Sequence, residues 1–404
     1  MRPGFGALGP RRARRGRHGG IAPSHGAGTD ETIGFVTPVF FRPIFALYAM
    51  ALCAAPLGAQ HWQMQYLYDE VKSTLSFNDL QFPSASRGVA AGVITEGTSH
   101  KSVALVTSDG GAHWQVVPLK ESPFSLFFLN DSIGWMVTEK GLWRTSESGK
   151  SWTKLPKVPA QALRVYFADE TNGWAACTNK TVLETHDGAQ HWTPVAAASS
   201  EPGNPQSSAY SWIAFANPQS GLIIGANEPV RRARLPDWLE PDTVLDRRET
   251  PHLSLTLQTH DGGKTWESHS TSMFGEITRS RFSPPNAGLG LIEHEQSFQY
   301  PSEVFRVSWP TGVNQVVYRD RNFFVSDVWV TPGGTYYLAG IEVASRLRSI
   351  VPQKVKVLMS RDLKTWTPTV VDYRAIANRV ILAGAGEDGL WVATNNGMIL
   401  RLAP

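Results

Sequence analysis

A short turn that ends in tryptophan occurs five times along the chain, and this repeat limits the possible folds more than any other feature. In four copies an acidic residue is followed two positions later by a small residue and five positions later by tryptophan, whereas the fifth copy is one residue shorter. The five copies contain Asp109, Gly111 and Trp114; Glu147, Gly149 and Trp152; Asp187, Ala189 and Trp192; Asp261, Gly263 and Trp266; and Asp362 and Trp366. Recurrence at this spacing indicates a repeat architecture.

The chemistry of the repeated turn is that of a β-hairpin. A carboxylate can accept backbone N–H groups across a tight turn, and a glycine supplies the positive φ that the reversal requires. The tryptophan then begins the next strand, where we expect its indole to pack inward and be buried. The repeat is therefore a structural device.

Each turn belongs to a unit of about four strands. A second recurrent element, a turn followed by an apolar strand, contains Trp135, Trp174, Leu222, Leu289 and Trp391. Four strands in about 49 residues are the content of a propeller blade. The units are 77–119, 121–159, 160–198, 210–273, 275–320, 323–371 and a last one from 374.

The last unit lacks an outer strand, and a candidate for it lies near the other end of the domain. The segment from His61, HWQMQYL, is similar to HWQVVPL from His113, which ends the first unit. The sequence therefore predicts an all-β, seven-bladed propeller over residues 60–404, closed by its N-terminal strand.

The residues before the propeller have the composition of a leader. Residues 1–36 are rich in Gly, Arg and Pro, which indicates a disordered or mis-started extension, and 37–59 are expected to be a signal peptide with its apolar part at 43–59. An uncleaved anchor helix is the alternative. We expect an exported protein, periplasmic or extracellular, whose single remaining cysteine, Cys177, is a small buried strand residue.

Composition excludes several classes of function. Apolar residues make up 42% and charged residues 18%, which favours a soluble globular protein. Residues 1–59 hold seven Arg against two acids, so the rest has 31 basic and 33 acidic residues, and a nucleic-acid binder is not expected. No motif calls for a cofactor. The histidines near the turns, His113, His186, His191 and His260, fall on separate blades, so no metal site is expected.

The repeated turn resembles the Asp-box of bacterial neuraminidase (BNR) propellers. Its pairing with NDSIGW, which ends at Trp135, resembles more closely the photosystem II stability and assembly factor family, over nearly all of 61–404. That resemblance implies a lumenal or periplasmic assembly chaperone that binds a membrane subunit and catalyses nothing. The fifth unit, 275–320, departs from the pattern because it has no recognisable Asp-box.

A carbohydrate-active propeller, related to sialidases or other glycoside hydrolases, is the alternative. Sialidases need an FRIP-type segment, which is absent; FFRP at Phe41 lies in the leader. Other propeller glycosidases place two carboxylates across a cleft, and the sequence does not test that distance for residues such as Asp131, Asp169 and Asp327.

Three insertions, 226–252, 293–302 and 341–353, fall between the second and third strands of neighbouring blades 4, 5 and 6. They should rise from the face opposite the Asp-boxes. There they either form one side of a binding surface or are tolerated insertions without a function. The candidate partner contacts are Arg231, Arg232, Arg234, Trp238, Arg346 and Arg348.

We therefore expect an exported, non-enzymatic, monomeric β-propeller. It would act as a protein-binding scaffold or as an assembly or stability factor, with a membrane or envelope protein among the candidate partners. No catalytic residue is assigned.

Overall fold

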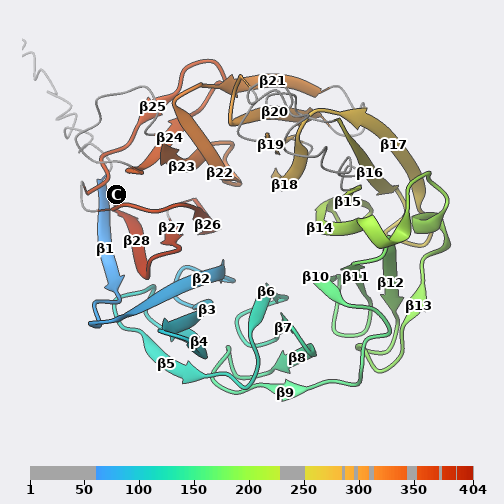
Figure 1. The fold of residues 1–404 in the computed structure, drawn as a ribbon, viewed down its shortest axis with the longest axis horizontal. Helices are drawn as coiled ribbons and strands as arrows, with labels where there is room; N and C mark the ends of the chain where they lie inside the picture. The colour runs from blue at the N-terminus through green and yellow to red at the C-terminus, as the bar shows by residue number, and fades with distance from the viewer. Residues whose placement is uncertain are drawn as a thin grey trace, which may run out of the picture. The chain divides into compact units, whose positions relative to one another are not determined.

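The computed structural model shows seven antiparallel sheets of four strands around a central opening (Figure 1). It describes residues 61–227, 251–283, 287–294, 299–308, 314–343, 353–372, 375–387 and 389–403, all within the compact unit Ala55–Pro404. The all-β, seven-bladed propeller is confirmed. The expected extension and signal peptide lie outside the described residues.

Each sheet is one blade, and its first strand lies nearest the central opening (Figure 1). Blade 1 has β2 (Ser73–Gln81), β3 (Gly88–Glu96), β4 (Ser99–Thr107) and β5 (Gln115–Pro118). Blade 2 has β6 (Pro123–Phe128), β7 (Gly134–Thr138), β8 (Gly141–Thr145) and β9 (Thr153–Lys154). Blade 3 has β10 (Ala162–Phe167), β11 (Gly173–Cys177), β12 (Thr181–Thr185) and β13 (Thr193–Pro194).

The next three blades follow the same order, after the short 3-10 helices η1 (Ala196–Ser199) and η2 (Pro205–Ser207). Blade 4 has β14 (Ser208–Asn217), β15 (Ser220–Asn227), β16 (His252–Thr259) and β17 (Glu267–Met273). Blade 5 has β18 (Glu276–Ser283), β19 (Ala287–Glu293), β20 (Ser302–Ser308) and β21 (Asn314–Arg319). Blade 6 has β22 (Phe323–Val330), β23 (Tyr336–Glu342), β24 (Val355–Ser360) and β25 (Thr367–Pro368).

The seventh sheet contains strands from both ends of the described chain. Its order is β26 (Val380–Ala385), β27 (Gly389–Thr394), β28 (Met398–Ala403) and β1 (His61–Leu67). β1 runs antiparallel to β28, from the pair His61 and Ala403 to the pair Leu67 and Met398. The indole of Trp62 is buried, and its Nε1 donates to Oγ1 of Thr369 in blade 6 at 2.8 Å.

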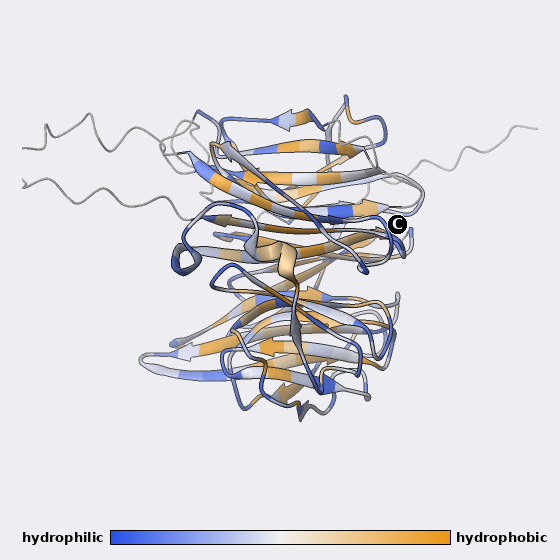
Figure 2. Cartoon of the chain, turned by 90° about the vertical axis from the view of Figure 1, so that its right-hand side faces the viewer, coloured by the Kyte–Doolittle hydropathy of each residue, from blue (hydrophilic) through white to orange (hydrophobic). Residues whose placement is uncertain are grey.

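Apolar residues fill the space between neighbouring blades. The second strands are covered on both faces, and every residue of β7 and β11 is buried. Figure 2 shows hydrophobic residues concentrated in the strands and hydrophilic residues in the connecting loops. Cys177 is fully buried in this core, and burial raises the pKa of its thiol to about 12, so it is a small core residue as predicted. No helix in the described ranges is long and apolar enough to cross a membrane.

The Asp-box turns have the expected hydrogen bonds in four of the five copies. Oδ1 of Asp109 accepts the backbone N–H of His113 at 2.9 Å, and Gly111 has a φ of 97°. Asp187, Asp261 and Asp362 likewise accept backbone N–H groups. In the second copy, the carboxylate of Glu147 accepts the hydroxyl of Ser151 at 2.6 Å instead.

The box tryptophans differ from expectation, because they are half-buried rather than fully buried. Trp266 meets Trp174 of the preceding blade edge to face, at 6.0 Å between ring centroids. The deeply buried indoles are those of the second strands, such as Trp135 and Trp391, which are fully covered. The box indoles meet their aromatic neighbours edge to face, as Trp114 meets Phe82 at 6.0 Å between ring centroids, and these contacts leave part of each indole exposed. Gly263 leaves room for Trp174, since an added Cβ would lie 2.1 Å from the ring.

The first strands of blades 1 to 6 each contain a β-bulge. A bulge adds one residue and redirects the side chain that follows it. The residues that resume pairing after the bulge occupy equivalent positions around the opening: Asp79, Ser125, Arg164, Trp212, Arg279 and Asp327.

Candidate functional site

The six candidate contacts predicted from the insertions all lie outside the described residues. Arg231, Arg232, Arg234 and Trp238 belong to 228–250, and Arg346 and Arg348 belong to 344–352. The strands that flank the insertions are the second and third strands of blades 4, 5 and 6. Those six residues remain a prediction.

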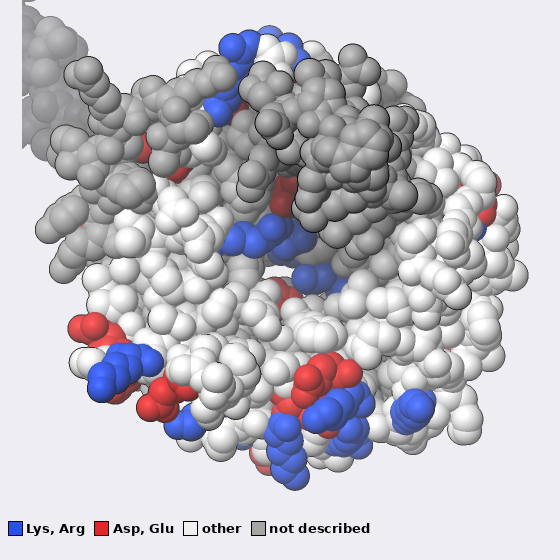
Figure 3. Space-filling view, viewed as in Figure 1, with Lys and Arg blue, Asp and Glu red and all other residues white. Residues whose placement is uncertain are grey.

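The described residues bring a different set of arginines together. Figure 3 shows Lys and Arg side chains gathered around the central opening. Three of them surround the indole of Trp212, which is only 2% exposed. The guanidinium carbon of Arg164, from β10, lies 4.1 Å from the ring centroid, and those of Arg279 and Arg281, from β18, lie at 4.7 and 4.9 Å. Close packing of guanidinium groups on an indole is stabilised by cation–π attraction.

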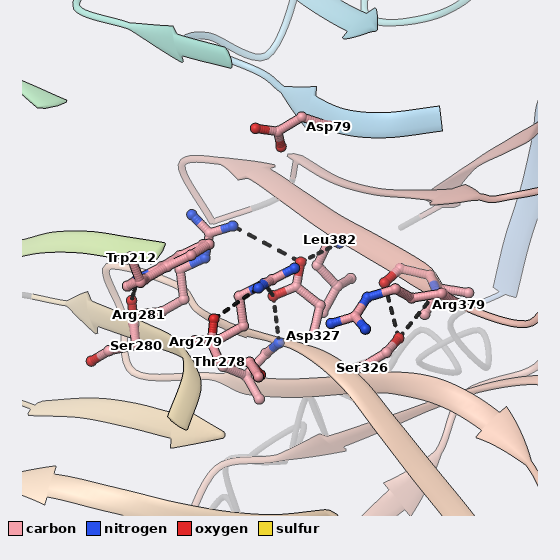
Figure 4. Close-up of polar contacts among 12 residues, drawn as sticks. Asp79, Trp212, Thr278, Arg279, Ser280, Arg281, Ser326, Asp327, Arg379 and Leu382 are labelled. Atoms are coloured by element: carbon pink, nitrogen blue, oxygen red, sulfur yellow. Dashed lines mark hydrogen bonds and ion pairs between the residues drawn. The ribbon is translucent and has the colours of Figure 1, made fainter. Parts of the chain in front are cut away.

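Trp212 is itself fixed in place. Its Nε1 donates to the carbonyl of Ser280 in the neighbouring blade at 2.8 Å (Figure 4). The arginines that pack on the ring are therefore held by a rigid platform, and less side-chain entropy is lost when they bind a ligand.

Two buried aspartates lie among these arginines. Asp79 lies 3.5 Å from Nη1 of Arg164, whereas the two oxygens of Asp327 lie 3.8 Å from Arg279 and 3.9 Å from Arg281. Three guanidinium groups against two carboxylates leave one positive charge.

The aspartates are already occupied by the backbone. Asp79 accepts the N–H of Leu80 and of Leu126, each at 2.9 Å. Asp327 accepts the N–H of Val328 and of Leu382, again at 2.9 Å (Figure 4). Each aspartate thus joins the first strand of its own blade to that of the next blade.

The guanidinium groups consequently retain unused donors. Within the described ranges, neither Arg164 nor Arg281 donates a hydrogen bond, and Nε of Arg281 is buried without a partner. Burial lowers the pKa of Arg164 to about 10 against the opposing effect of Asp79, and burial also lowers the pKa of Arg279. Both groups remain charged at neutral pH.

A further arginine near the opening, Arg379, forms a bidentate ion pair. Arg379 donates to both oxygens of Glu293, at 3.1 and 2.5 Å. Oγ1 of Thr278 donates to the same carboxylate at 2.7 Å. This pair connects blades 5 and 7, and its donors are less available to a ligand than those of Arg164 and Arg281.

The geometry favours binding of an anion over acid–base catalysis. Unpaired guanidinium donors in a partly buried setting suit carboxylates and phosphates. The three carboxylates considered for a glycosidase differ in their surroundings. Asp327 is buried and hydrogen-bonded, whereas Asp131 and Asp169 are exposed, so they do not form a catalytic pair. Hydrogen bonds from Asn172 and Thr171 hold the pKa of Asp169 far below its usual range, so it cannot act as a general acid at neutral pH.

No cluster of His, Cys, Asp and Glu among the described residues could hold a metal ion. His113 and His191 are exposed, and the Nδ1 of each lies 2.6 Å from the aspartate of its own turn.

The arginine cluster was missed from the sequence. The cluster and its two aspartates lie on five different first strands between Asp79 and Asp327, and none of these residues belongs to a repeated motif. The available signal was an Arg-x-Arg pair, Arg279 and Arg281, in an expected strand next to the opening. Charged residues are rare at such positions unless they pair or bind a ligand.

No protein-family model matches the chain, and no curated protein matches it in sequence. Solved structures match it in fold. YCF48 bound to a D1 peptide aligns with a TM-score of 0.54 and 16% identity, covering 85% of this chain and 97% of that one. YCF48 from Cyanidioschyzon merolae aligns with a TM-score of 0.55 and 15% identity, covering 85% and 98%.

An ancestral GH74 enzyme is also similar, with a TM-score of 0.51 and 12% identity. The match covers 84% of this chain but 46% of that enzyme. At identities this low, each likeness shows the propeller fold alone.

Proposed function

We propose that this chain is an exported, non-enzymatic β-propeller that binds a protein partner and acts as a scaffold or assembly factor. The arginines of the central opening hold an acidic group of that partner. The observation that carries the proposal is the set of unpaired donors on Arg164 and Arg281, packed on the rigid indole of Trp212.

The physical basis is the strength of guanidinium–carboxylate recognition. A charge-assisted hydrogen bond in a partly buried site is about twice as strong as a neutral one. Asp79 and Asp327 lie 3.5 to 3.9 Å from the arginines without accepting hydrogen bonds from them, and the carboxylates bond to backbone N–H groups instead. A carboxylate of a partner can therefore pair with the guanidinium groups directly.

The comparison with YCF48 supports this reading. That propeller, of similar fold, has been solved with a D1 peptide bound. By analogy we propose a peptide segment of another protein as the ligand here. Export and a monomeric state are proposed from the sequence, and the insertion residues Arg231, Arg232, Arg346 and Arg348 are proposed as further contacts.

The test is capture of the partner from an extract of the native host by the purified propeller, followed by mass spectrometry. Changing Arg164 and Arg281 to Lys keeps the charge but removes the planar fork of donors. We expect this variant to keep its melting temperature within a few degrees and to lose at least three quarters of the captured partner. The matched control is Arg361→Lys, in an exposed turn of blade 6.

If the double variant and the control captured equal amounts of the partner, the central opening would not be the binding site. If a variant with Arg231, Arg232, Arg346 and Arg348 changed to Ala then lost capture, the site would move to the insertions.

A carbohydrate-active propeller is the second candidate, and the GH74 likeness in fold is what favours it. A panel of chromogenic glycosides separates the two. If the protein hydrolyses one of these glycosides, and the activity disappears when one carboxylate is changed to its amide, the protein is a hydrolase and the proposed binding function is wrong.

A further inference from the structure

A groove of about 290 Å³ lies between blades 1 and 2, on a surface that the central opening does not include. Its apolar lining comes from both blades: Val117 of β5, Met136 of β7, Trp143 of β8 and Trp152 of the blade 2 Asp-box. Pockets for whole small molecules start at about 300 Å³, so this groove suits one or two side chains.

One wall of the groove departs from the blade pattern. Trp143 lies four residues before the acidic residue of its turn. At the same position the other Asp-box blades carry leucine: Leu105, Leu183, Leu257 and Leu358. A large indole, 7% exposed, therefore stands in the lining of this groove where the other four turns carry leucine.

A buried carboxylate fixes that indole. Glu121 is 8% exposed, and its Oε2 accepts Nε1 of Trp143 at 2.9 Å and Oγ1 of Thr138 at 2.5 Å. Its Oε1 accepts the ammonium group of Lys154 at 2.5 Å. Although burial opposes ionisation, the bonds from Lys154 and Thr138 lower the pKa of Glu121, so it is charged at neutral pH. The carboxylate thus accepts three hydrogen bonds from the protein, and its burial limits access to it from solvent.

Lysines surround the groove. Lys120 and Lys150 line it, and the ammonium groups of Lys120 and Lys154 lie 5.9 and 5.6 Å from the centroid of Trp143. Glu121 neutralises Lys154, which leaves Lys120 and Lys150 against the single carboxylate of Glu147, in the same turn as Lys150. The two lysines outnumber that carboxylate, so the edge of the groove favours a negatively charged ligand.

We propose that this groove binds a short acidic peptide segment of a protein partner, with one aromatic side chain of the segment seated between Trp143, Trp152 and Met136. Aromatic rings and a thioether are favourable neighbours for an aromatic side chain. Carboxylates on either side of that side chain pair with Lys120 and Lys150. A sugar fits the groove less well, because Glu121 is buried and already accepts three hydrogen bonds from the protein, so it offers little to the hydroxyl groups of a sugar.

The test measures fluorescence anisotropy of a labelled probe peptide, EEFEE, titrated with the propeller. We expect saturable binding that weakens with added salt, and at least a fivefold loss of affinity when the probe is EEAEE. Changing Lys120 and Lys150 to Ala should weaken EEFEE binding at least fivefold. The matched control changes Lys264 and Lys364, exposed lysines in the turns of blades 4 and 6, to Ala.

A second variant tests the indole wall. Trp143→Leu introduces the residue of the other Asp-box blades and should also weaken EEFEE binding at least fivefold, with folding checked by the melting temperature. No binding of EEFEE to the unchanged protein, or equal affinity of the lysine variant and its control, would overturn the proposal. Displacement of the probe by cellotetraose would overturn it in favour of a sugar site.

Binding of EEFEE at the groove does not depend on the function proposed for the central opening. The variant with Arg164 and Arg281 changed to Lys should bind EEFEE with unchanged affinity. If that variant bound EEFEE more weakly, the probe would bind in the central opening and not in the groove.

Discussion

At the scale of single residues, the buried aspartates decide how neighbouring first strands meet. Asp327 accepts the N–H of Val328 in its own strand and of Leu382 in the next blade, and it lies between Arg279 and Arg281. One side chain therefore satisfies two buried donors and balances two cations. Asp79 likewise accepts two backbone N–H groups between blades 1 and 2, and it lies beside one cation, Arg164.

We predict that Asp327→Asn destabilises the protein by about 3 to 5 kcal/mol, since it removes the charge that balances buried arginines and places an amide donor against a backbone N–H. Chemical denaturation measures this cost. Asp131→Asn, at an exposed loop position, is the control and should change the free energy of unfolding by less than about 0.5 kcal/mol. A loss below about 1 kcal/mol for Asp327→Asn would show that water replaces the carboxylate without penalty.

At the scale of elements, the Asp-box is a turn held by one ionised carboxylate. A backbone bond and a side-chain bond from His113 lower the pKa of Asp109 to about 2. The corresponding bonds from His191 and Thr265 lower the pKa of Asp187 and of Asp261, each to about 2. In the unfolded chain these groups titrate near pH 3.9.

A depressed pKa in the folded state stabilises the fold above the unfolded pKa, and the stabilisation is lost as the pH falls through the folded pKa. We therefore predict that the melting temperature declines between about pH 4 and pH 2. A variant with Asp109, Asp187 and Asp261 changed to Asn should show a shallower decline than the unchanged protein. Parallel curves for the two proteins, measured by circular dichroism at each pH, would contradict a role for the turn carboxylates.

At the scale of the whole molecule, the outer edge of β28 in the seventh blade is covered because β1 pairs with it. Trp62 of β1 also reaches Thr369 and Val370 of blade 6. An unpaired strand exposes backbone donors and acceptors and invites aggregation. We infer that β1 closes the ring and stabilises every blade.

We predict that deleting residues 60–68 lowers the melting temperature of the whole domain by more than about 10 °C, since one strand of a closed ring is lost. Gln63→Ala, at an exposed position of β1, is the control for changes in this strand that leave its pairing intact. Differential scanning calorimetry measures both. The closure inference fails if the truncated protein melts at the same temperature as the intact one.

The sequence by itself determined the elements of this protein. The acidic turns and the strands that precede them predicted seven four-stranded blades, because hydrogen bonds of the turn and alternation along a strand are local. The positive φ of Gly111 and Gly263 and the burial of Cys177 followed from the same patterns.

Only the tertiary structure decided which side chains meet. Arg164, Trp212 and Arg279 lie on different blades, and they converge because bulges redirect equivalent residues of the first strands toward one opening. Trp143 is a buried core residue that also lines a groove between two blades, and the sequence pattern does not show that groove. The box tryptophans looked like core residues and are half-buried, because burial depends on the depth between neighbouring blades, which a one-dimensional pattern does not encode.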